Sequence, residues 1–296
     1  ARDKMGRIPV ILGKSEDGYC AAFESFAYKK LGYSDYKELG PGEIVEITAN
    51  GVTQLSPPRK EMRICSFLWT YYGYSTSDYE GVNVELMRYR NGEIMARDEV
   101  IRGSLPKVDY VAGVPDSGLD AALGYARASG IPYGIGLIKN KYIGRTFISP
   151  GQESRVDKVR IKLSPVESEI RGKRVVLIDD SIVRGTTSGR IVQLLRDAGA
   201  TEIHMRVSAP PFLHPCYYGT DIDSEEYLIA CHHSVSEIAK MIGVDSLGYL
   251  PLEDLKNLTG NEHFCSACFS GAYPTDIPED TRKDQFEQKL SLRKDK

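Results

Sequence analysis

Apolar residues are concentrated most densely in the run Val175–Ile178, which no polar residue interrupts. An unbroken apolar run is typical of a strand buried on both faces, as in a parallel sheet. Farther along, apolar residues from Ile191 to Ala198 recur at helical spacing and stop at Gly199, where a helix is expected to end. The pattern predicts a strand, a loop and a helix that belong to a parallel α/β sheet.

The loop between this strand and this helix is rich in carboxylates, hydroxyls and glycine. Asp179 and Asp180 follow the strand directly, at the carboxyl end where open α/β sheets bind ligands. Carboxylates suit sugar hydroxyls or a hydrated Mg²⁺, and a loop that leads into a helix N-terminus suits a phosphate. The expected ligand is therefore a phosphorylated sugar. A nucleotide-binding Walker B strand also ends in two acids, but its partner motif is missing, because Ile8 stands where the first glycine before Gly13-Lys14-Ser15 is required.

The rest of the chain predicts a β-rich start and a longer α/β part. In the first 60 residues we expect four short strands and one helix, and Asn50-Gly51 predicts a hairpin between the last two strands; the ranges are Arg7–Leu12, Tyr19–Phe23, Ile44–Thr48 and Val52–Leu55 for the strands and Glu24–Leu31 for the helix. From Asp109 a strand, a helix and a second strand predict a βαβ unit with parallel strands. The later expected elements are helices at Tyr79–Arg97, Leu119–Ala128 and Glu237–Met241, strands at Tyr133–Ile138 and Ile203–Val207, and a charged helix or frayed tail at Glu279–Lys296.

Composition limits the classes of protein that fit. With 296 residues, 41% of them hydrophobic, the chain can build a sizeable core, and two domains are expected. A net charge of -3 and the lack of a basic face argue against nucleic acid as the main partner. No stretch has the length of a membrane span, and the first residues do not resemble a signal peptide. Six cysteines without a secretion signal indicate a reduced, cytoplasmic setting and a candidate metal site.

Val175–Thr187 resembles the phosphoribosyl-pyrophosphate (PRPP) loop of the type I phosphoribosyltransferases. The resemblance implies that Asp179 and Asp180 hold the ribose hydroxyls and help to bind Mg²⁺. It implies that the 5′-phosphate is wrapped by Ser181, Ile182, Val183, Arg184, Gly185, Thr186, Thr187 and Ser188. The alternative is an acidic pair that merely caps a helix.

Two further loops resemble parts of the same site. Val114–Gly118 is similar to the family's pyrophosphate loop, which would place Asp116, Ser117 and Gly118 at the diphosphate and Ser117 near Mg²⁺, although Asp-Ser-Gly is also a common turn. Lys139–Phe147 is similar to the catalytic loop, and would place three side chains around the diphosphate, whereas the alternative is a solvated charged loop. Those three side chains are Lys139, Tyr142 and Arg145. By analogy alone, the residues that extend this match belong to a nucleotide-binding or regulatory surface; they are Arg155, Arg160 and Lys162.

The N-terminal part is similar to the second half of the glutaminase domain of the glutamine PRPP amidotransferases. Arg2-Asp3-x-x-Gly6 and Gly40-Pro41-Gly42-Glu43 carry this resemblance. It implies a type I phosphoribosyltransferase fold, a parallel sheet flanked by helices, preceded by a partial, β-rich N-terminal-nucleophile glutaminase domain. The expected divisions are a glutaminase-like part (1–60), a connecting region (61–100), a phosphoribosyltransferase domain (101–260) and a C-terminal cysteine-pair segment with a charged tail (261–296).

The chain departs from the family pattern at three places. The family's Gly-Ile-Arg-Pro-Leu is Gly6-Arg7-Ile8-Pro9-Val10 in this sequence. Leu68 replaces the Glu that follows Cys-x-Phe, and Gly73–Ser77 replaces Ala-Arg-Pro-Asp-Ser. The last two changes leave open a paralogue with another amine acceptor.

Four cysteines match the positions that ligate a [4Fe–4S] cluster in one branch of the amidotransferase family. They are Cys65, Cys216, Cys265 and Cys268. Thiolates suit such a cluster, a four-cysteine zinc site is the rival, and buried free thiols are the third alternative. Cys20 and Cys231 are expected to be core residues. His232 and His233 are adjacent and are not expected to form a metal pair.

The resemblance implies an amidophosphoribosyltransferase, which makes 5-phosphoribosylamine and diphosphate from PRPP and glutamine or ammonia as the first step of purine biosynthesis. It implies Mg²⁺ as cofactor, purine nucleotides as feedback inhibitors and a homo-oligomer. The family's glutaminase reaction uses an N-terminal cysteine; since the chain begins with Ala1 and Cys20 lies inside an expected strand, this chain alone is expected to use ammonia. The alternatives are a non-catalytic PRPP or nucleotide sensor and a paralogous phosphoribosyltransferase with another acceptor.

Overall fold

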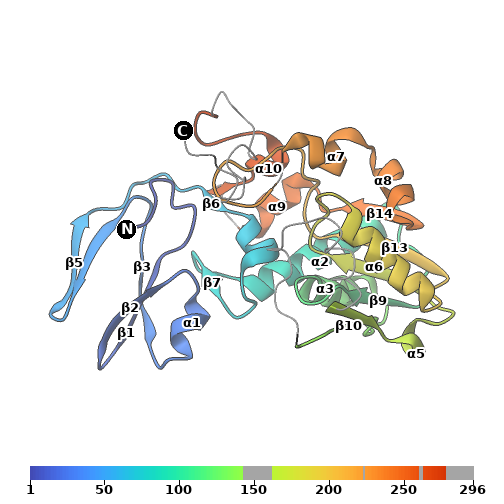
Figure 1. The fold of residues 1–296 in the computed structure, drawn as a ribbon, viewed down its shortest axis with the longest axis horizontal. Coiled ribbons are helices and arrows are strands. Elements are labelled where there is room, and N and C mark those ends of the chain that lie inside the picture. Colours follow the sequence, from blue (N-terminus) through green and yellow to red (C-terminus); the bar gives the residue numbers. More distant parts are fainter. Residues whose placement is uncertain (143–161, 223, 260–262, 278–296) are drawn as a thin grey trace, which may run out of the picture.

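The fold centres on a four-stranded parallel sheet with the order β14-β13-β12-β9 (Figure 1). The computed structural model describes residues 1–142, 162–222, 224–259 and 263–277. The four strands are β9 (Tyr110–Gly113), β12 (Arg174–Asp179), β13 (Glu202–Val207) and β14 (Ser246–Tyr249). The apolar run Val175–Ile178 lies in β12, with a parallel neighbour on each side, so the predicted buried strand is confirmed.

Two hydrophobic cores cover the two faces of this sheet. Along β12, Val176 and Ile178 pack toward one core with Tyr125, whereas Val175 and Leu177 pack toward the other. The helices of the first side are α2 (Val84–Arg102) and α3 (Gly118–Ser129), and those of the second side are α6 (Thr186–Asp197) and α8 (Val235–Ile242). Successive side chains of β12 point to opposite faces of the sheet, and helices cover both faces. All four apolar residues are therefore fully buried.

Caps and glycines explain where the helices begin and how closely they pack. The predicted helix Tyr79–Arg97 starts later than expected, at Val84, because the Asn83 side chain accepts the backbone N–H of Leu86 and caps the first turn. Helix α2 then packs closely against α3. A Cβ on Gly124 would lie 1.9 Å from the carbonyl oxygen of Tyr89, so only glycine permits this approach.

The N-terminal residues form two small antiparallel sheets, at the left of Figure 1. One has the order β2-β1-β3 and the other is the β4-β5 hairpin, as the Asn50-Gly51 signal predicts. The predicted strand Arg7–Leu12 begins only at Ile11, because Arg7 has a different, buried role described below. The elements are β1 (Ile11–Ser15), β2 (Gly18–Ala22), α1 (Ser25–Lys29), β3 (Ser34–Glu38), β4 (Ile44–Thr48) and β5 (Gly51–Ser56).

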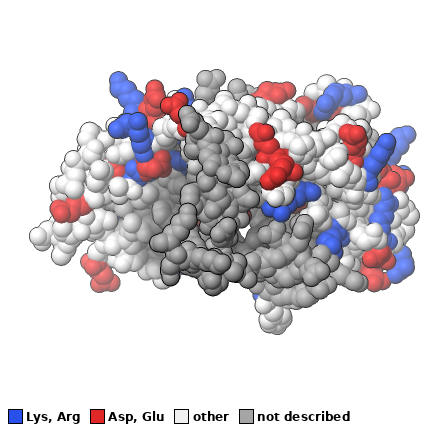
Figure 2. Space-filling model, turned by 45° about the horizontal axis from the view of Figure 1, so that its top comes forward, with Lys and Arg blue, Asp and Glu red and all other residues white. Residues whose placement is uncertain are grey.

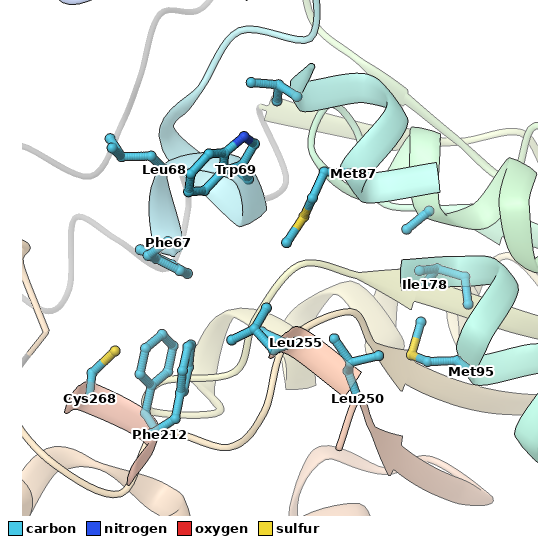
Figure 3. Packing of buried hydrophobic residues seen from close by; sticks show 14 of the residues in the cluster. Phe67, Leu68, Trp69, Met87, Met95, Ile178, Phe212, Leu250, Leu255 and Cys268 are labelled. Atoms are coloured by element: carbon cyan, nitrogen blue, oxygen red, sulfur yellow. The ribbon is translucent and has the colours of Figure 1, made fainter. Parts of the chain in front are cut away.

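A junction of short elements connects these sheets to the α/β part. Strand β6 pairs in parallel with β15 from near the C-terminus, so segments far apart in sequence meet here. Figure 3 shows the core below this junction, with Phe67 and Trp69 pointing toward Phe212, Met87 and Leu255. The junction consists of β6 (Ile64–Cys65), the π-helix η1 (Leu68–Tyr72), β7 (Asp78–Tyr79), β8 (Val82–Asn83), β15 (Phe264–Cys265) and α10 (Ala267–Ser270).

The predicted strand Tyr133–Ile138 is only partly right. Tyr133 forms an isolated parallel bridge to Val111, but the regular strand is β10, which pairs antiparallel with β11. A Cβ on Gly134 would lie 2.6 Å from the Tyr110 ring, so the chain crosses closely over β9 before β10 begins. The remaining elements are β10 (Leu137–Lys139), β11 (Leu163–Pro165), α5 (Glu167–Ile170), η2 (Glu225–Tyr227), α7 (Ile229–His232) and α9 (Leu252–Thr259).

The surface has no single dominant charge on the face that Figure 2 shows. Basic and acidic side chains are interspersed over the described part of that face, in keeping with a net charge of -3. Among the described residues, no helix has both the length and the apolar character that crossing a membrane requires.

Candidate functional site

The loops that follow β9 and β12 meet at the carboxyl edge of the sheet. The backbone N–H of Val114 donates to the carbonyl oxygen of Ile178 at 2.8 Å. A Cβ on Gly118 would lie 2.5 Å from the same carbonyl oxygen, so glycine lets the start of α3 approach the end of β12. Ser117 Oγ then donates to Asp180 Oδ1 at 2.7 Å. The structure thus joins the predicted pyrophosphate loop directly to the predicted PRPP loop.

Asp179 and Asp180 form a buried acidic pair at the end of β12, exposed by 6% and 7%. The backbone N–H of Asp180 donates to Asp179 Oδ1 at 3.0 Å, and Ser181 Oγ donates to Asp180 Oδ2 at 2.5 Å. Burial, and next the charge of Asp180, raise the pKa of Asp179 well above its ordinary value, while Lys162 opposes this shift. Two adjacent carboxyl groups in this environment suit a bound cation or the hydroxyls of a sugar.

The rest of the predicted PRPP loop leads into the N-terminus of α6. Ile182 is buried, and the carbonyl oxygen of Val183 accepts the N–H of Ile229 at 2.9 Å, which fixes the loop against α7. Gly185, with φ of 78°, turns the chain into α6; a Cβ there would lie 2.7 Å from Ile229 Cδ1. Thr186 and Thr187 are exposed at the first turn, which is where a helix favours a bound phosphate.

Two other residues of this loop point away from that first turn. The Arg184 guanidinium lies over the Tyr227 ring, with 4.9 Å from its carbon to the ring centroid. Ser188 is buried on the inner side of α6. Thr186 and Thr187 are therefore the exposed hydroxyls of the first turn of α6.

The predicted catalytic loop is described only at its start. Lys139 forms an ion pair with Asp116 of the pyrophosphate loop, so the two sequence predictions converge at one place. Tyr142 is 99% exposed and makes no side-chain contact with this pair. Arg145 lies outside the described residues.

Lys162 is a residue of the site that sequence reasoning placed elsewhere. Its carbonyl oxygen accepts the N–H of Asn140 at 2.8 Å, and the neighbouring Leu163 pairs with Lys139 across β10 and β11. Burial, and next Lys139, lower the pKa of Lys162, while Asp116 and the acidic pair raise it. The ammonium charge of Lys162 therefore interacts with Asp116 and with the acidic pair at the carboxyl edge of the sheet. The signal that could have found it is a lysine at the start of a strand that returns beside Lys139.

The four predicted ligand cysteines are brought together at the junction between the sheets and the α/β part. All four are buried free thiols, and Cys65 lies opposite Cys265 in the β6–β15 register. Burial raises the pKa of Cys268 well above its ordinary value, and the charges of the other three cysteines add to this shift. Cys216 Sγ accepts the N–H of Tyr218 at 3.4 Å, and Cys65 Sγ lies 3.7 Å from Thr220 Oγ1.

The described residues contain no three His, Cys, Asp or Glu side chains arranged around a single metal ion. Cys20 and Cys231, expected in the core, are only half-buried. Cys231 packs against the large core from its edge, and its thiol donates to the carbonyl oxygen of Leu213 at 3.2 Å.

Comparison with known proteins extends over nearly the whole chain. Residues 100–225 match the family described as the phosphoribosyl transferase domain. The chain is 44% identical to the amidophosphoribosyltransferase of Bacillus subtilis over 288 residues, which cover 95% of this chain and 60% of that protein. It is 43% identical to the amidophosphoribosyltransferase of Archaeoglobus fulgidus over 282 residues, which cover 94% of this chain and 61% of that protein.

A solved structure agrees with these relatives. The glutamine PRPP amidotransferase of B. subtilis, complexed with ADP and GMP, matches with a TM-score of 0.82 at 44% identity, over 94% of this chain and 62% of that chain. The chain therefore spans about three fifths of the length of these relatives. Over the part that it spans, the chain is similar in sequence and structure to the amidophosphoribosyltransferases and has the type I phosphoribosyltransferase fold.

Proposed function

We propose that the chain transfers the phosphoribosyl group of PRPP to ammonia, forming 5-phosphoribosylamine and diphosphate, the reaction that opens purine biosynthesis. The observation that carries this proposal is the hydrogen bond of 2.7 Å from Ser117 to Asp180, because it joins a diphosphate-binding loop to a ribose-binding acidic pair. The family resemblance supports the same reaction.

The proposed roles follow from where each group lies. Asp179 and Asp180 hold the ribose hydroxyls, and the first turn of α6, with Thr186 and Thr187, binds the 5′-phosphate. Both ends of PRPP are then fixed, so that the sugar carbon between them is presented to the incoming nitrogen in one orientation. Ser117 orients Asp180 and lies where the diphosphate would be bound.

Departure of diphosphate places negative charge on the leaving group, and the site has cations at that position. Lys139 is paired with Asp116, and we infer that the diphosphate replaces Asp116 as its partner. The charge of Lys162 is directed toward the same edge. Fixed cations that already face the developing charge lower the barrier without needing to reorganise during the reaction.

Mg²⁺ is the proposed cofactor of this step, and the buried acidic pair with Ser117 fits it, since carboxylate and hydroxyl oxygens are its preferred ligands. When bound, the ion neutralises charge on the diphosphate. The nucleotides ADP and GMP, present in the solved B. subtilis structure, are the proposed type of feedback inhibitor.

We further propose a [4Fe–4S] cluster at Cys65, Cys216, Cys265 and Cys268, in preference to zinc. The donor set fits, because four buried thiols from three separate segments meet there. A zinc ion held by the same four thiolates is the rival, and iron, sulfide and zinc assays of the purified chain distinguish the two. Thiolates at Cys65, Cys216, Cys265 and Cys268 would hold the cluster.

Diphosphate release from PRPP, Mg²⁺ and ammonium chloride tests the proposed reaction. We expect turnover by the wild-type chain and about a hundredfold or greater loss in Asp180→Asn, because a charge aligned with the transition state is removed. Asp197→Asn, at the exposed far end of α6, is the matched control and should keep wild-type turnover. Tight PRPP binding by the wild-type chain without diphosphate release would instead indicate a sensor.

A further inference from the structure

Arg7 brings a buried positive charge from the N-terminal segment to the four cysteines. Its side chain reaches the loop at Cys216 and Thr220 and is only 5% exposed as a residue. Nη2 donates to Thr220 Oγ1 at 2.8 Å and lies 3.7 Å from Cys216 Sγ, while Nε donates to the carbonyl oxygen of Tyr218 at 2.9 Å. The guanidinium carbon is 5.1 Å from the centroid of the Tyr218 ring.

These partners satisfy the hydrogen bonds of Arg7 but do not balance its charge. In the part of the chain that the structure describes, no carboxylate forms an ion pair with Arg7. Arg2, the other buried arginine of this segment, contrasts with it, because Arg2 is paired with Glu80 at 2.6 Å. Burying a guanidinium without an anion is strongly unfavourable, because the charge loses its hydration. A negative charge close to Cys216 would therefore stabilise the buried guanidinium of Arg7.

A cluster held by four thiolates would supply that negative charge. The sulfur nearest to Arg7 belongs to Cys216, and Cys65 shares Thr220 with Arg7 as a common neighbour. Net charge and hydrogen bonds to sulfur are the means by which a protein sets the reduction potential of an iron–sulfur cluster.

We propose that Arg7 is a positioning residue for the iron–sulfur centre. Its guanidinium supplies a positive charge that compensates the negative charge of the cluster and so raises the reduction potential of the cluster. The inference rests on the cluster proposed above. Arg7 comes from the segment Gly6-Arg7-Ile8-Pro9-Val10, where arginine stands one position earlier than in the family pattern Gly-Ile-Arg-Pro-Leu. It also links the N-terminal segment to the centre through Tyr218 and Thr220.

The test compares Arg7→Met and Arg7→Lys with wild type, all purified without oxygen. Lys4→Met is the matched control, because it removes the same charge from an exposed position of the same segment. Iron and sulfide are measured per chain, and the midpoint potential is then obtained by titration with dithionite, which supplies one electron per cluster, followed by absorbance. We expect Arg7→Met to shift the reduction equilibrium about tenfold toward the oxidised form, a fall of about 59 mV. Arg7→Lys and Lys4→Met should stay near the wild-type potential.

Each other outcome has a defined reading. The charge role is also supported if Arg7→Met loses iron while Arg7→Lys keeps both its iron and the wild-type potential. If both variants lose iron, Arg7 is only a structural anchor and the inference fails. The inference fails alone if the wild-type chain carries the cluster and Arg7→Met has the same potential. If the wild-type chain holds zinc or no metal, the cluster proposal fails together with it, whereas diphosphate release still reports on the transferase proposal separately.

Discussion

At the scale of single residues, Asp180 connects the two loops of the candidate site. Its two carboxylate oxygens accept from different segments, Oδ1 from Ser117 and Oδ2 from Ser181. The carboxylate is thereby oriented from both sides in a nearly buried position. The sequence showed that these residues belong to two separate loops, but only the fold shows that one hydrogen bond joins them.

Ser117→Ala should weaken PRPP binding more than it weakens the fold. The change removes the donor to Asp180 Oδ1 and leaves the Ser181 contact intact. Since a hydrogen bond to a charged group contributes about 1.5–3 kcal/mol, we expect the KM for PRPP to rise about tenfold. Steady-state kinetics measure this, and Ser129→Ala, at the other end of α3, serves as the control. An unchanged KM in Ser117→Ala would show that the link has no role in binding.

Glu38 should make stability depend on pH near neutrality. Burial, and then the charge of Glu80, raise its pKa from 4.5 to about 7, although Arg2 opposes the shift. The folded state thus keeps a proton that the unfolded state loses above about pH 4.5. Stability is therefore lost as the pH rises from about 4.5 to about 7, and the loss is complete above that range.

Glu38→Gln removes this titration. Relative to the variant, wild type should lose at most about 3 kcal/mol of unfolding free energy between pH 5 and pH 8. The measured loss should be smaller than this limit, because water still reaches the Glu38 carboxylate and screens its charge. Denaturant unfolding at the two pH values measures the difference. Glu46→Gln, exposed on β4, is the control. The idea is wrong if wild type and Glu38→Gln show the same pH dependence.

At the scale of elements, α2 and α3 lie so close together that glycine is required on both. A Cβ on Gly92 would lie 1.8 Å from the carbonyl oxygen of Ala121, and the contact of Gly124 with Tyr89 is similar. Helix α3 begins at Gly118, directly after Ser117, so its seating against α2 also positions the loop of the site. A helix–helix contact on one side of the sheet therefore helps to position the predicted pyrophosphate loop.

Gly124→Ala should force α3 away from α2. An added methyl group meets backbone, which cannot rotate away, so we expect a loss of roughly 1–3 kcal/mol in unfolding free energy and a higher KM for PRPP. Gly189→Ala in α6 is the matched control, because the nearest atom would be 3.7 Å away. That variant should gain up to about 1 kcal/mol, since alanine favours a helix. Equal stability of the two variants would contradict this account.

How well the elements could be predicted depends on whether the signal was local. The unbroken run Val175–Ile178 identifies β12, and Asn50-Gly51 identifies the β4-β5 hairpin. Both signals depend only on residues within the element itself. Tyr133–Ile138 misled, because the order strand, helix, strand does not determine which strand is the partner, and β10 pairs with β11 instead. Lys162 was misplaced for the same reason, as only the β10–β11 pairing brings it beside Lys139.

At the scale of the whole molecule, the four cysteines join three segments that are remote in sequence. Cys65 belongs to β6, Cys216 follows β13, and Cys265 and Cys268 belong to β15 and α10. Cys268 lies beside Phe212 at one end of the large core (Figure 3). The parallel pairing of β6 with β15 extends over only two residues on each strand. A pairing that short contributes little by itself, so the proposed cluster would stabilise this junction.

Loss of the proposed cluster should therefore destabilise the chain as a whole. A ligand that binds only the folded state adds its binding free energy to stability, and a loss of about 3 kcal/mol lowers the Tm by roughly 5 °C or more. Thermal unfolding of the anaerobic protein, before and after iron is removed by oxidation and chelation, measures this drop. Cys265→Ser should lose iron and melt at the lower temperature, whereas Cys231→Ser, whose thiol contacts Leu213 instead, should keep both its iron and its Tm. If iron removal leaves the Tm unchanged, the contacts of β6, β15 and their surrounding core hold the junction without a metal.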